Sequence, residues 1–155
     1  MKKSFTCLLC ALFLTGLAFT QTKPKAVVKQ ASAGLEKLLS GTGLPYKIIN
    51  DSLAVVPYEG ENIKSFKVII QGISDLYIIY SNLTETFPGK IDEKKYKYLL
   101  QQNNHFDIVK IGVSADDNMA YLRADVYKAG TNTPLLKRVI AQVANVTNII
   151  GGDLK

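Results

Sequence analysis

Residues 119–150 read MAYLRADVYKAGTNTPLLKRVIAQVANVTNII, and a strand pattern is followed by a helix pattern within this one stretch. Apolar and polar side chains alternate from residue 119 to 127, as they do in a strand with one buried face. Thr133 and Pro134 then match the N-cap and the first position of a helix. The apolar stripe of that helix consists of Leu135, Leu136, Val139, Ile140, Val143, Val146 and Ile150. We expect the helix to end at Gly151-Gly152 and its stripe to cover a sheet.

A second alternating strand precedes this stretch, over residues 108–113, and the acidic turn Asp116-Asp117-Asn118 joins the two strands. Before it, EKKYKYLLQQNN (residues 93–104) predicts a helix with Asp92 as its N-cap. Tyr96, Leu99 and Leu100 share the face of this helix that we expect to be buried. Tyr98 lies almost opposite to them and is expected to face solvent.

Residues 46–83 have the composition of strands. YKII and SLAVV flank the turn pair Asn50-Asp51, and Pro57 limits the second of these strands to an edge or an end of a sheet. SFKVII and LYIIY follow, separated by residues 72–75. LYIIY is apolar at nearly every position, so we expect a central strand that is covered on both faces.

A helical stripe over residues 26–39 precedes these strands, and Gly41 and Gly43 supply its stop. The predicted order is therefore α-βββ(β)-α-ββ-α. Strands joined by hairpins give an α+β fold with a mainly antiparallel sheet of about five to six strands. The first and the last helix are expected to pack on one face of that sheet.

The N-terminus reads MKKSFTCLLCALFLTGLAFTQTKPK and has the three parts of a secretory signal peptide. Lys2 and Lys3 precede an apolar run, and Ala18 and Thr20 stand at the −3 and −1 positions of a cleavage site. The apolar run is too short for an ordinary membrane-spanning helix. We expect residues 1–20 to be removed, residues 21–25 to form a short tether and residues 26–155 to form one domain. The mature protein is expected in the periplasm or outside the cell, with no transmembrane segment.

Composition narrows the range of functions. Both cysteines, Cys7 and Cys10, leave with the leader, so no disulfide, catalytic thiolate or cysteine metal site is expected. The formal charge of the chain is +6, and the loss of Lys2 and Lys3 lowers it to +4. That excess is too small and too dispersed to predict a nucleic-acid partner.

The chemistry-bearing residues do not form a catalytic or metal-binding pattern. His105 is the only histidine, which excludes a histidine-based triad and a two-histidine zinc site. Asp116-Asp117-Asn118 lacks the spacing of a calcium loop and is interpreted as a hairpin turn. We therefore expect no catalytic residue, no metal and no cofactor.

Tyrosine is the residue type that stands out, with eight copies and no tryptophan. The helix and strand patterns leave Tyr98, Tyr121 and Tyr127 exposed. An aromatic side chain on a polar surface is a common contact residue, so these three are the candidate partner contacts.

KYKYLLQQNNHFDIVKIGVSADDNMAYLRADV, followed by TPLLKRVIAQVANVTNII, resembles the YbjN-type sensory-domain family. The Leu-Leu-x-x-Asn-Asn end of the second helix, the paired strands around an acidic turn and the final helix carry the resemblance. That family shares its α-β-β-β-α-β-β-α fold with type III secretion chaperones. The resemblance implies a non-enzymatic, often dimeric domain that binds protein segments or whose role is unknown. Those relatives are mostly cytoplasmic, whereas this chain carries an export signal.

Two functions of different class follow. The first is an exported binding or adaptor domain that presents a sheet face or a helix to a second copy of the chain, as a homodimer, or to an envelope protein. The second is a binder of a small molecule or an envelope lipid, in the space between sheet and helices. Bound lipid in the purified protein would favour the second function, and co-purification of one envelope protein would favour the first.

The leader pattern predicts the mass of the exported protein. Cleavage after Thr20 leaves Gln21 as the first residue, free or cyclised to pyroglutamate. Intact-mass spectrometry of protein recovered from outside the cytoplasm measures this directly. A mass that still includes residues 1–20 would contradict cleavage and indicate an anchored protein.

Overall fold

The computed structural model describes residues 34–86, 91–114 and 119–154. The leader, the tether, the first part of the predicted helix at 26–39 and the turn at 116–118 lie outside the described residues. The elements follow in the order α1 (Leu35–Ser40), β1 (Lys47–Asn50), β2 (Leu53–Tyr58), β3 (Phe66–Ile73), β4 (Leu76–Asn82), α2 (Leu83–Thr86), α3 (Glu93–Gln102), β5 (Lys110–Val113), β6 (Ala120–Tyr127), η1 (Lys128–Gly130) and α4 (Thr133–Asp153).

The strands form one six-stranded sheet in the order β1-β2-β3-β4-β6-β5, and each neighbouring pair is antiparallel. The predicted α+β class and antiparallel sheet are confirmed. At the first hairpin, Oδ1 of Asn50 accepts hydrogen bonds from the backbone and the hydroxyl of Ser52, which holds the tight turn. Pro57 lies beyond the residues of β2 that pair with β1, at the end of the strand, as predicted.

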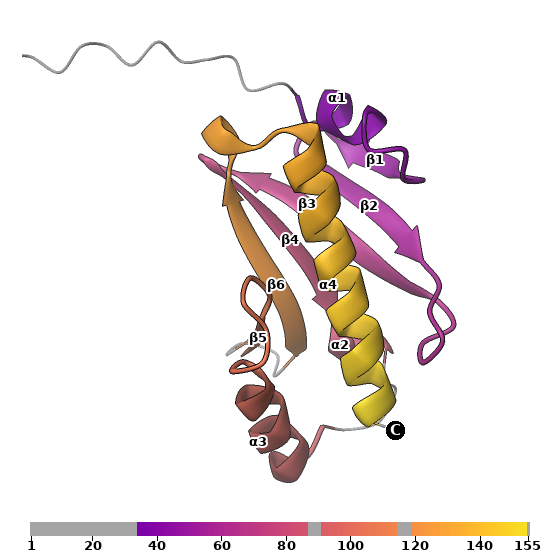
Figure 1. Ribbon diagram of the computed structural model, residues 1–155, viewed down its shortest axis with the longest axis vertical. Helices are drawn as coiled ribbons and strands as arrows, with labels where there is room; N and C mark the ends of the chain where they lie inside the picture. Colours follow the sequence, from indigo (N-terminus) through magenta and orange to yellow (C-terminus); the bar gives the residue numbers. More distant parts are fainter. Residues whose placement is uncertain (1–33, 87–90, 115–118, 155) are drawn as a thin grey trace, which may run out of the picture.

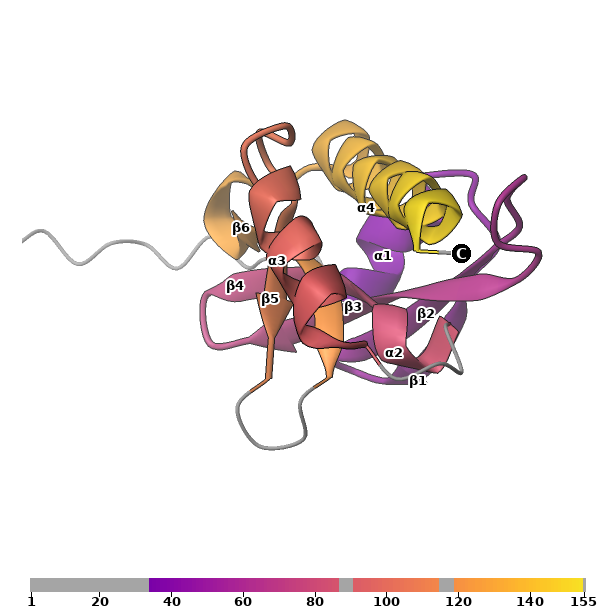
Figure 2. The same ribbon diagram turned by 90° about the horizontal axis from the view of Figure 1, so that it is seen from below.

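The long helix α4 lies along the sheet, and α1 lies beside it on the same face (Figure 1). The view from below shows both helices on one side of the sheet (Figure 2). Thr133 at the start of α4 donates a side-chain hydrogen bond to the carbonyl of Leu38 in α1. The first and last helix therefore share one face, as the sequence predicts.

The core lies between α4 and this face. The predicted stripe is confirmed in its central part, since Leu136, Val139, Ile140, Val143 and Ile150 are fully buried. The four central strands, β2, β3, β4 and β6, contribute their inward residues: Ala54, Val56, Val68, Ile70, Tyr77, Ile79, Leu122 and Ala124. Burial of each large aliphatic side chain contributes roughly 1.5–3 kcal/mol, so this contact is the main source of stability.

Both ends of α4 differ from the prediction by a small shift. The N-cap is Asn132, whose side chain accepts a hydrogen bond from the amide of Leu135, one residue before the predicted Thr133. Gly151 and Gly152 do not end the helix, which continues to Asp153. A Cβ at Gly152 would lie 2.8 Å from the side chain of Asn62, so this glycine permits close packing instead.

β4 is the central strand that its apolar sequence predicts, but one of its faces is less covered than expected. Tyr77, Ile79 and Ser81 are buried beneath α4, whereas Ile78 and Tyr80 on the other face are half-buried. Within residues 34–154 as described, no helix lies over that second face. The prediction that both faces are covered is therefore wrong for the described part of the chain.

The burial of α4 makes its central position sensitive to charge. Val143→Asp places a carboxylate where the side chain is fully buried, and an unpaired buried charge costs roughly 3–5 kcal/mol. That cost approaches the total stability of many domains, about 5–15 kcal/mol. We expect an unfolded or insoluble variant by circular dichroism, while Asn145→Asp on the exposed side of the same helix folds normally. A native spectrum for Val143→Asp would contradict this packing.

The open face of the sheet

The face of the sheet opposite α4 and α1, here called the open face, carries every second residue of each strand. Its residues are mainly apolar and aromatic, with four basic residues and one acidic residue among them. Its apolar members are Leu53, Val55, Ile69, Ile73, Leu76, Ile78, Tyr80, Tyr121 and Tyr127. All are half-buried or exposed, and Ile73 and Tyr127 have 45% and 68% of their surface in contact with solvent. Ile73 and Tyr127 are the last residues of β3 and β6, and the half-buried residues between the strand ends extend the apolar patch across the sheet.

The strand register aligns one row of side chains across all six strands. Reading from β1 to β5, the directly paired residues are Lys47, Val55, Ile69, Tyr80, Arg123 and Lys110. The two ends of this row, here called the cross-strand row, are basic, and the middle is apolar and aromatic. Sequence separation conceals the row, because its members come from residues 47 to 123.

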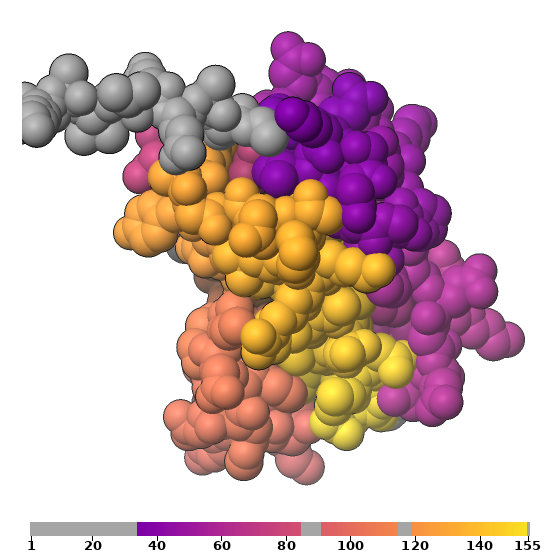
Figure 3. All heavy atoms as spheres, turned by 45° about the horizontal axis from the view of Figure 1, so that its top comes forward, coloured from indigo at the N-terminus to yellow at the C-terminus, as the bar shows by residue number. Residues whose placement is uncertain are grey.

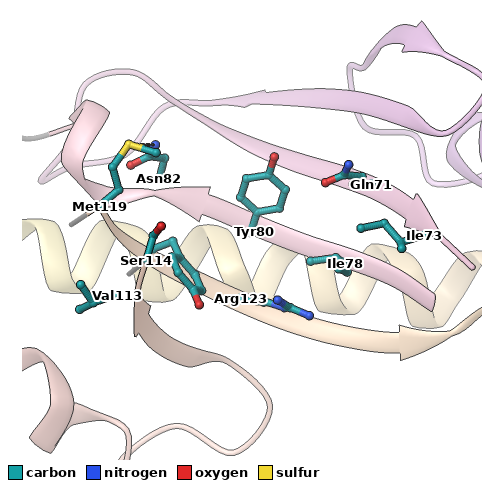
Figure 4. Close-up of a pocket in the computed structure, with 10 residues that line it drawn as sticks. Gln71, Ile73, Ile78, Tyr80, Asn82, Val113, Ser114, Met119 and Arg123 are labelled. Atoms are coloured by element: carbon teal, nitrogen blue, oxygen red, sulfur yellow. Dashed lines mark hydrogen bonds between the residues drawn. The ribbon is translucent and has the colours of Figure 1, made fainter. Parts of the chain in front are cut away.

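A hollow of about 410 Å³ lies in the open face over β3, β4 and β6. Figure 4 shows Tyr80 in its middle, with Gln71 and Ile73 on one side and Arg123 on the other. Val113, Ser114 and Met119 border it at the β5 end. The walls are therefore mostly apolar, with amide and guanidinium groups at the margin, which is the composition of a site that receives side chains of another molecule.

Gly112 in β5 makes room for one wall of this hollow. It pairs with Tyr121 in β6, and a Cβ at Gly112 would lie 2.6 Å from the ring of Tyr121. Any larger residue would displace that ring. The glycine therefore lets Tyr121 lie across β5 and beside the hollow.

Arg123 and Asp125 form an ion pair at the margin of the hollow. The Nε and Nη2 groups of Arg123 donate to the two carboxylate oxygens of Asp125, at 2.7 and 2.9 Å. Hydrogen bonding to Asp125 raises the pKa of the Arg123 guanidinium further above its usual range. The two side chains are 39% and 40% exposed, so the pair contributes little to stability. Its effect is to fix the direction of the guanidinium.

At the outer edge of β5, a side chain occupies backbone hydrogen-bonding groups. The amide of Asn103 donates to the carbonyl of Ile111 and accepts from its N–H, at 3.0 and 2.6 Å. These are the groups of Ile111 that a further strand would need. At the other edge, β1 has four residues and an irregular register between Ile48 and Asn50. Short, bulged or capped strands are poor templates for strand addition, so the open face is the better binding surface.

The three tyrosines predicted as partner contacts lie in two places. Tyr121 and Tyr127 are on the open face, Tyr121 half-buried and Tyr127 exposed. Tyr98 is not directed to solvent, and that expectation is wrong: its ring is half-buried against the core and its hydroxyl donates to the carboxylate of Asp153 at the end of α4. Leu100, expected inside, is 54% exposed. A role of Tyr98 in partner contact stays a prediction.

The buried face of α3 keeps Leu99 and Tyr96 as predicted but includes Tyr98 in place of Leu100, which follows from where the helix is placed. α3 packs at the end of the sheet, against β5, and Leu99 is its fully buried residue. In the space-filling view, the segment with α3 and β5 lies beside the C-terminal half of α4 (Figure 3). Tyr98 points to that helix, while Leu100 points away from both neighbours. The periodicity of a single helix cannot show on which side a second helix will lie.

No residue pattern in the open face indicates metal chemistry. Across the ranges that the structure describes, no three His, Cys, Asp or Glu side chains come together as a metal site. His105 is exposed, just after α3. In the same ranges, none of the helices has both the length and the apolar character that crossing a membrane requires.

Comparison with known proteins identifies the fold. No protein-family model matches the sequence, and no curated protein matches it. Among solved structures, a chain of the heterodimeric ExoU–SpcU complex of the Pseudomonas aeruginosa type III secretion system matches with a TM-score of 0.53 and 16% identity, over 76% of this chain and 94% of that chain.

Two further structures match over similar lengths. YbjN of E. coli, described as a putative transcription regulator, has a TM-score of 0.55 and 13% identity, over 79% of this chain and 91% of its own. A chain of the ExsC–ExsE complex has a TM-score of 0.50 and 11% identity, over 73% and 84%. The chain therefore has the fold shared by YbjN and type III secretion chaperones, as its second half suggested.

The hydrogen bond between Tyr98 and Asp153 predicts a pH dependence of stability. Burial, with the hydrogen bond and charge of Asp153, raises the pKa of Tyr98 from 10.0 to about 12. A folded-state pKa above the unfolded value gives a contribution that is complete below pH 10 and is lost as the pH rises toward 12. Tyr98→Phe lacks this contribution.

The difference in unfolding free energy between wild type and Tyr98→Phe should thus be constant up to about pH 9 and shrink above pH 10. Urea denaturation at a series of pH values measures it. Tyr127→Phe is the matched control, because Tyr127 is exposed at the end of β6, whereas Asp153 ends α4 and bonds Tyr98. A difference that persists unchanged at pH 11.5 would show that Tyr98 and Asp153 are not bonded.

Proposed function

We propose that this chain, which has the fold of YbjN and of type III secretion chaperones, is an exported binding domain whose open face receives a segment of another protein. It acts by binding and not by catalysis. The observation that carries the proposal is the open face itself, where a central strand leaves Ile78 and Tyr80 half-exposed beside a hollow of about 410 Å³.

Energetics support a partner at this face. Apolar area in contact with water costs about 25 cal/mol per Å² relative to burial. Large exposed apolar patches in folded proteins mark interaction sites. The opposite face of the same strands is covered by α4 and α1, so the fold itself does not require apolar residues on the open side. The apolar residues of the open face would contribute to the binding of a partner that buries them.

Proteins with this fold also supply precedent. SpcU is described in a heterodimeric complex with ExoU, and ExsC in a complex with ExsE. These likenesses are at 16% and 11% identity, and they support a protein-binding role by analogy alone. The signal peptide that we expect in residues 1–20 leads us to propose a partner in the periplasm or outside the cell.

A small-molecule or lipid ligand is the second candidate. The hollow has a volume within the range of ligand sites, about 300–1,000 Å³. However, it lies open along the sheet, on the face opposite α4, and not between sheet and helices. An open hollow encloses a small ligand poorly, so a partner that covers the whole face fits better.

A capture experiment with paired variants tests this function. Tagged mature protein is used to capture a partner from native envelope extract, in wild type, Tyr80→Ser and Ile149→Ser. Tyr80 is in the hollow, while Ile149 is 49% exposed on α4, on the other side of the molecule. We expect one captured protein to be lost with Tyr80→Ser and retained with Ile149→Ser. Equal capture by both variants would contradict binding at the open face.

A further inference from the structure

The chemistry of the partner is indicated by the cross-strand row, Lys47-Val55-Ile69-Tyr80-Arg123-Lys110. We propose that the open face binds a partner segment that lies across the strands, apolar in its middle and acidic at both ends. This inference rests on the proposed binding function and specifies the chemistry of the ligand. It is carried by the charge pattern, the register and the shape of the face.

The charges of the open face have one predominant sign. The basic strand residues are Lys47, Lys67, Lys110 and Arg123, and the acidic one is Asp125. Lys47 lies on the edge strand β1, and Arg123 and Lys110 lie on β6 and β5 at the other side, whereas Lys67 is on β3, outside the row and two residues before Ile69. Between them the row has Val55, Ile69 and Tyr80. A complementary segment therefore has carboxylates at its ends and apolar side chains between them.

Lys110 and Arg123 give a second indication. They are directly opposite each other in the β5–β6 pair, and like charges in that position destabilise a sheet. The chain partly compensates them, because Asp125 binds Arg123 and the carbonyls of Asn103 and Phe106 accept from Lys110 Nζ. The carbonyls are neutral, so a net positive charge remains at this end of the row. An acidic group of a ligand would relieve the repulsion.

The dimensions of the row restrict the segment. Neighbouring strands are about 4.8 Å apart, so Lys47 and Arg123, separated by four strand spacings, are about 19 Å apart. A helix rises about 1.5 Å per residue and covers that span in about 13 residues. The hollow lined by Tyr80 and Ile78 would take the apolar side chains at the centre of such a segment.

Two other occupants fit less well. A second copy of this chain bound face to face would bring Lys47 and Lys67 against the basic residues of its mate, which opposes association. A flat anionic membrane would attract the basic residues of the open face but would leave the hollow unfilled. A protein segment with a convex apolar centre meets both the charges and the shape.

Fluorescence anisotropy with three designed helical peptides of 18 residues tests the inference. All three have the same apolar stripe. The first has Glu at both ends, the second has Lys at both ends, and the third has Glu in the middle of its polar face. We expect the peptide with acidic ends to bind wild type most tightly and to weaken as NaCl rises from 50 to 500 mM. Preference for the Lys-ended peptide, equal affinity for all three, or no binding of any would overturn the inference.

Variants locate the binding to the row. Lys47→Gln with Arg123→Gln removes one charge at each end and should weaken the acid-ended peptide about threefold to tenfold, since an exposed ion pair contributes modestly. Lys137→Gln with Arg138→Gln, both exposed on α4, is the matched control and should change nothing. Thermal unfolding confirms that both variants are folded. Equal effects of the two pairs would show that the attraction is not specific to the row.

Two controls cover the other occupants. Vesicles containing phosphatidylglycerol that bind wild type while the acid-ended peptide does not would overturn the proposal in favour of lipid. Sedimentation that shows a wild-type dimer and a monomeric Tyr80→Ser variant would also overturn the proposal.

The capture and peptide experiments together distinguish this inference from the proposed function. If Tyr80→Ser abolishes capture of a protein but the Lys-ended peptide binds best, the open face binds a partner and only the acidic chemistry is wrong.

Discussion

The packing of α4 against one face of the sheet determines the rest of this structure. The helix is 21 residues long, enough to extend beside β3, β4 and β6, and its buried aliphatic side chains meet the inward residues of those strands. A strand has two faces, and one long helix with the short α1 covers one of them. The same contact that stabilises the fold therefore defines the other face as a surface.

That second face is the part of the molecule whose residues are not explained by folding. Polar residues at Ile78, Tyr80 and Tyr127 would avoid the cost of exposed apolar area without disturbing the packing of α4. The opposed basic pair at Lys110 and Arg123 adds repulsion where the fold gains nothing. Apolar exposure and unbalanced charge on one surface are both reduced by a partner. Local disagreement with the rules of folding is typical of functional sites.

The sequence predicts the core better than the site. Alternation in residues 119–127 and the stripe of the last helix depend on local periodicity, and both are confirmed. The burial of LYIIY could not be assigned from sequence, because an apolar strand looks the same whether one or both of its faces are covered. The cross-strand row could not be found either, since it depends on the register of five strand pairs. Tyr121 and Tyr127 were identified by their alternation, whereas Tyr80 was hidden in a continuous apolar run.

The helix-covered face and the open face are physically connected through α3. The hydroxyl of Tyr98 joins α3 to Asp153 at the end of α4, and Asn103 at the end of α3 binds both backbone groups of Ile111 in β5. Gly112 follows in β5 and receives the ring of Tyr121, which borders the hollow. The position of this end of the open face is thus fixed by contacts that begin on the opposite side of the molecule. A partner that moved β5 would have to disturb these hydrogen bonds, so the basic end of the row is held in place before binding, and preorganisation of this kind lowers the entropic cost of association.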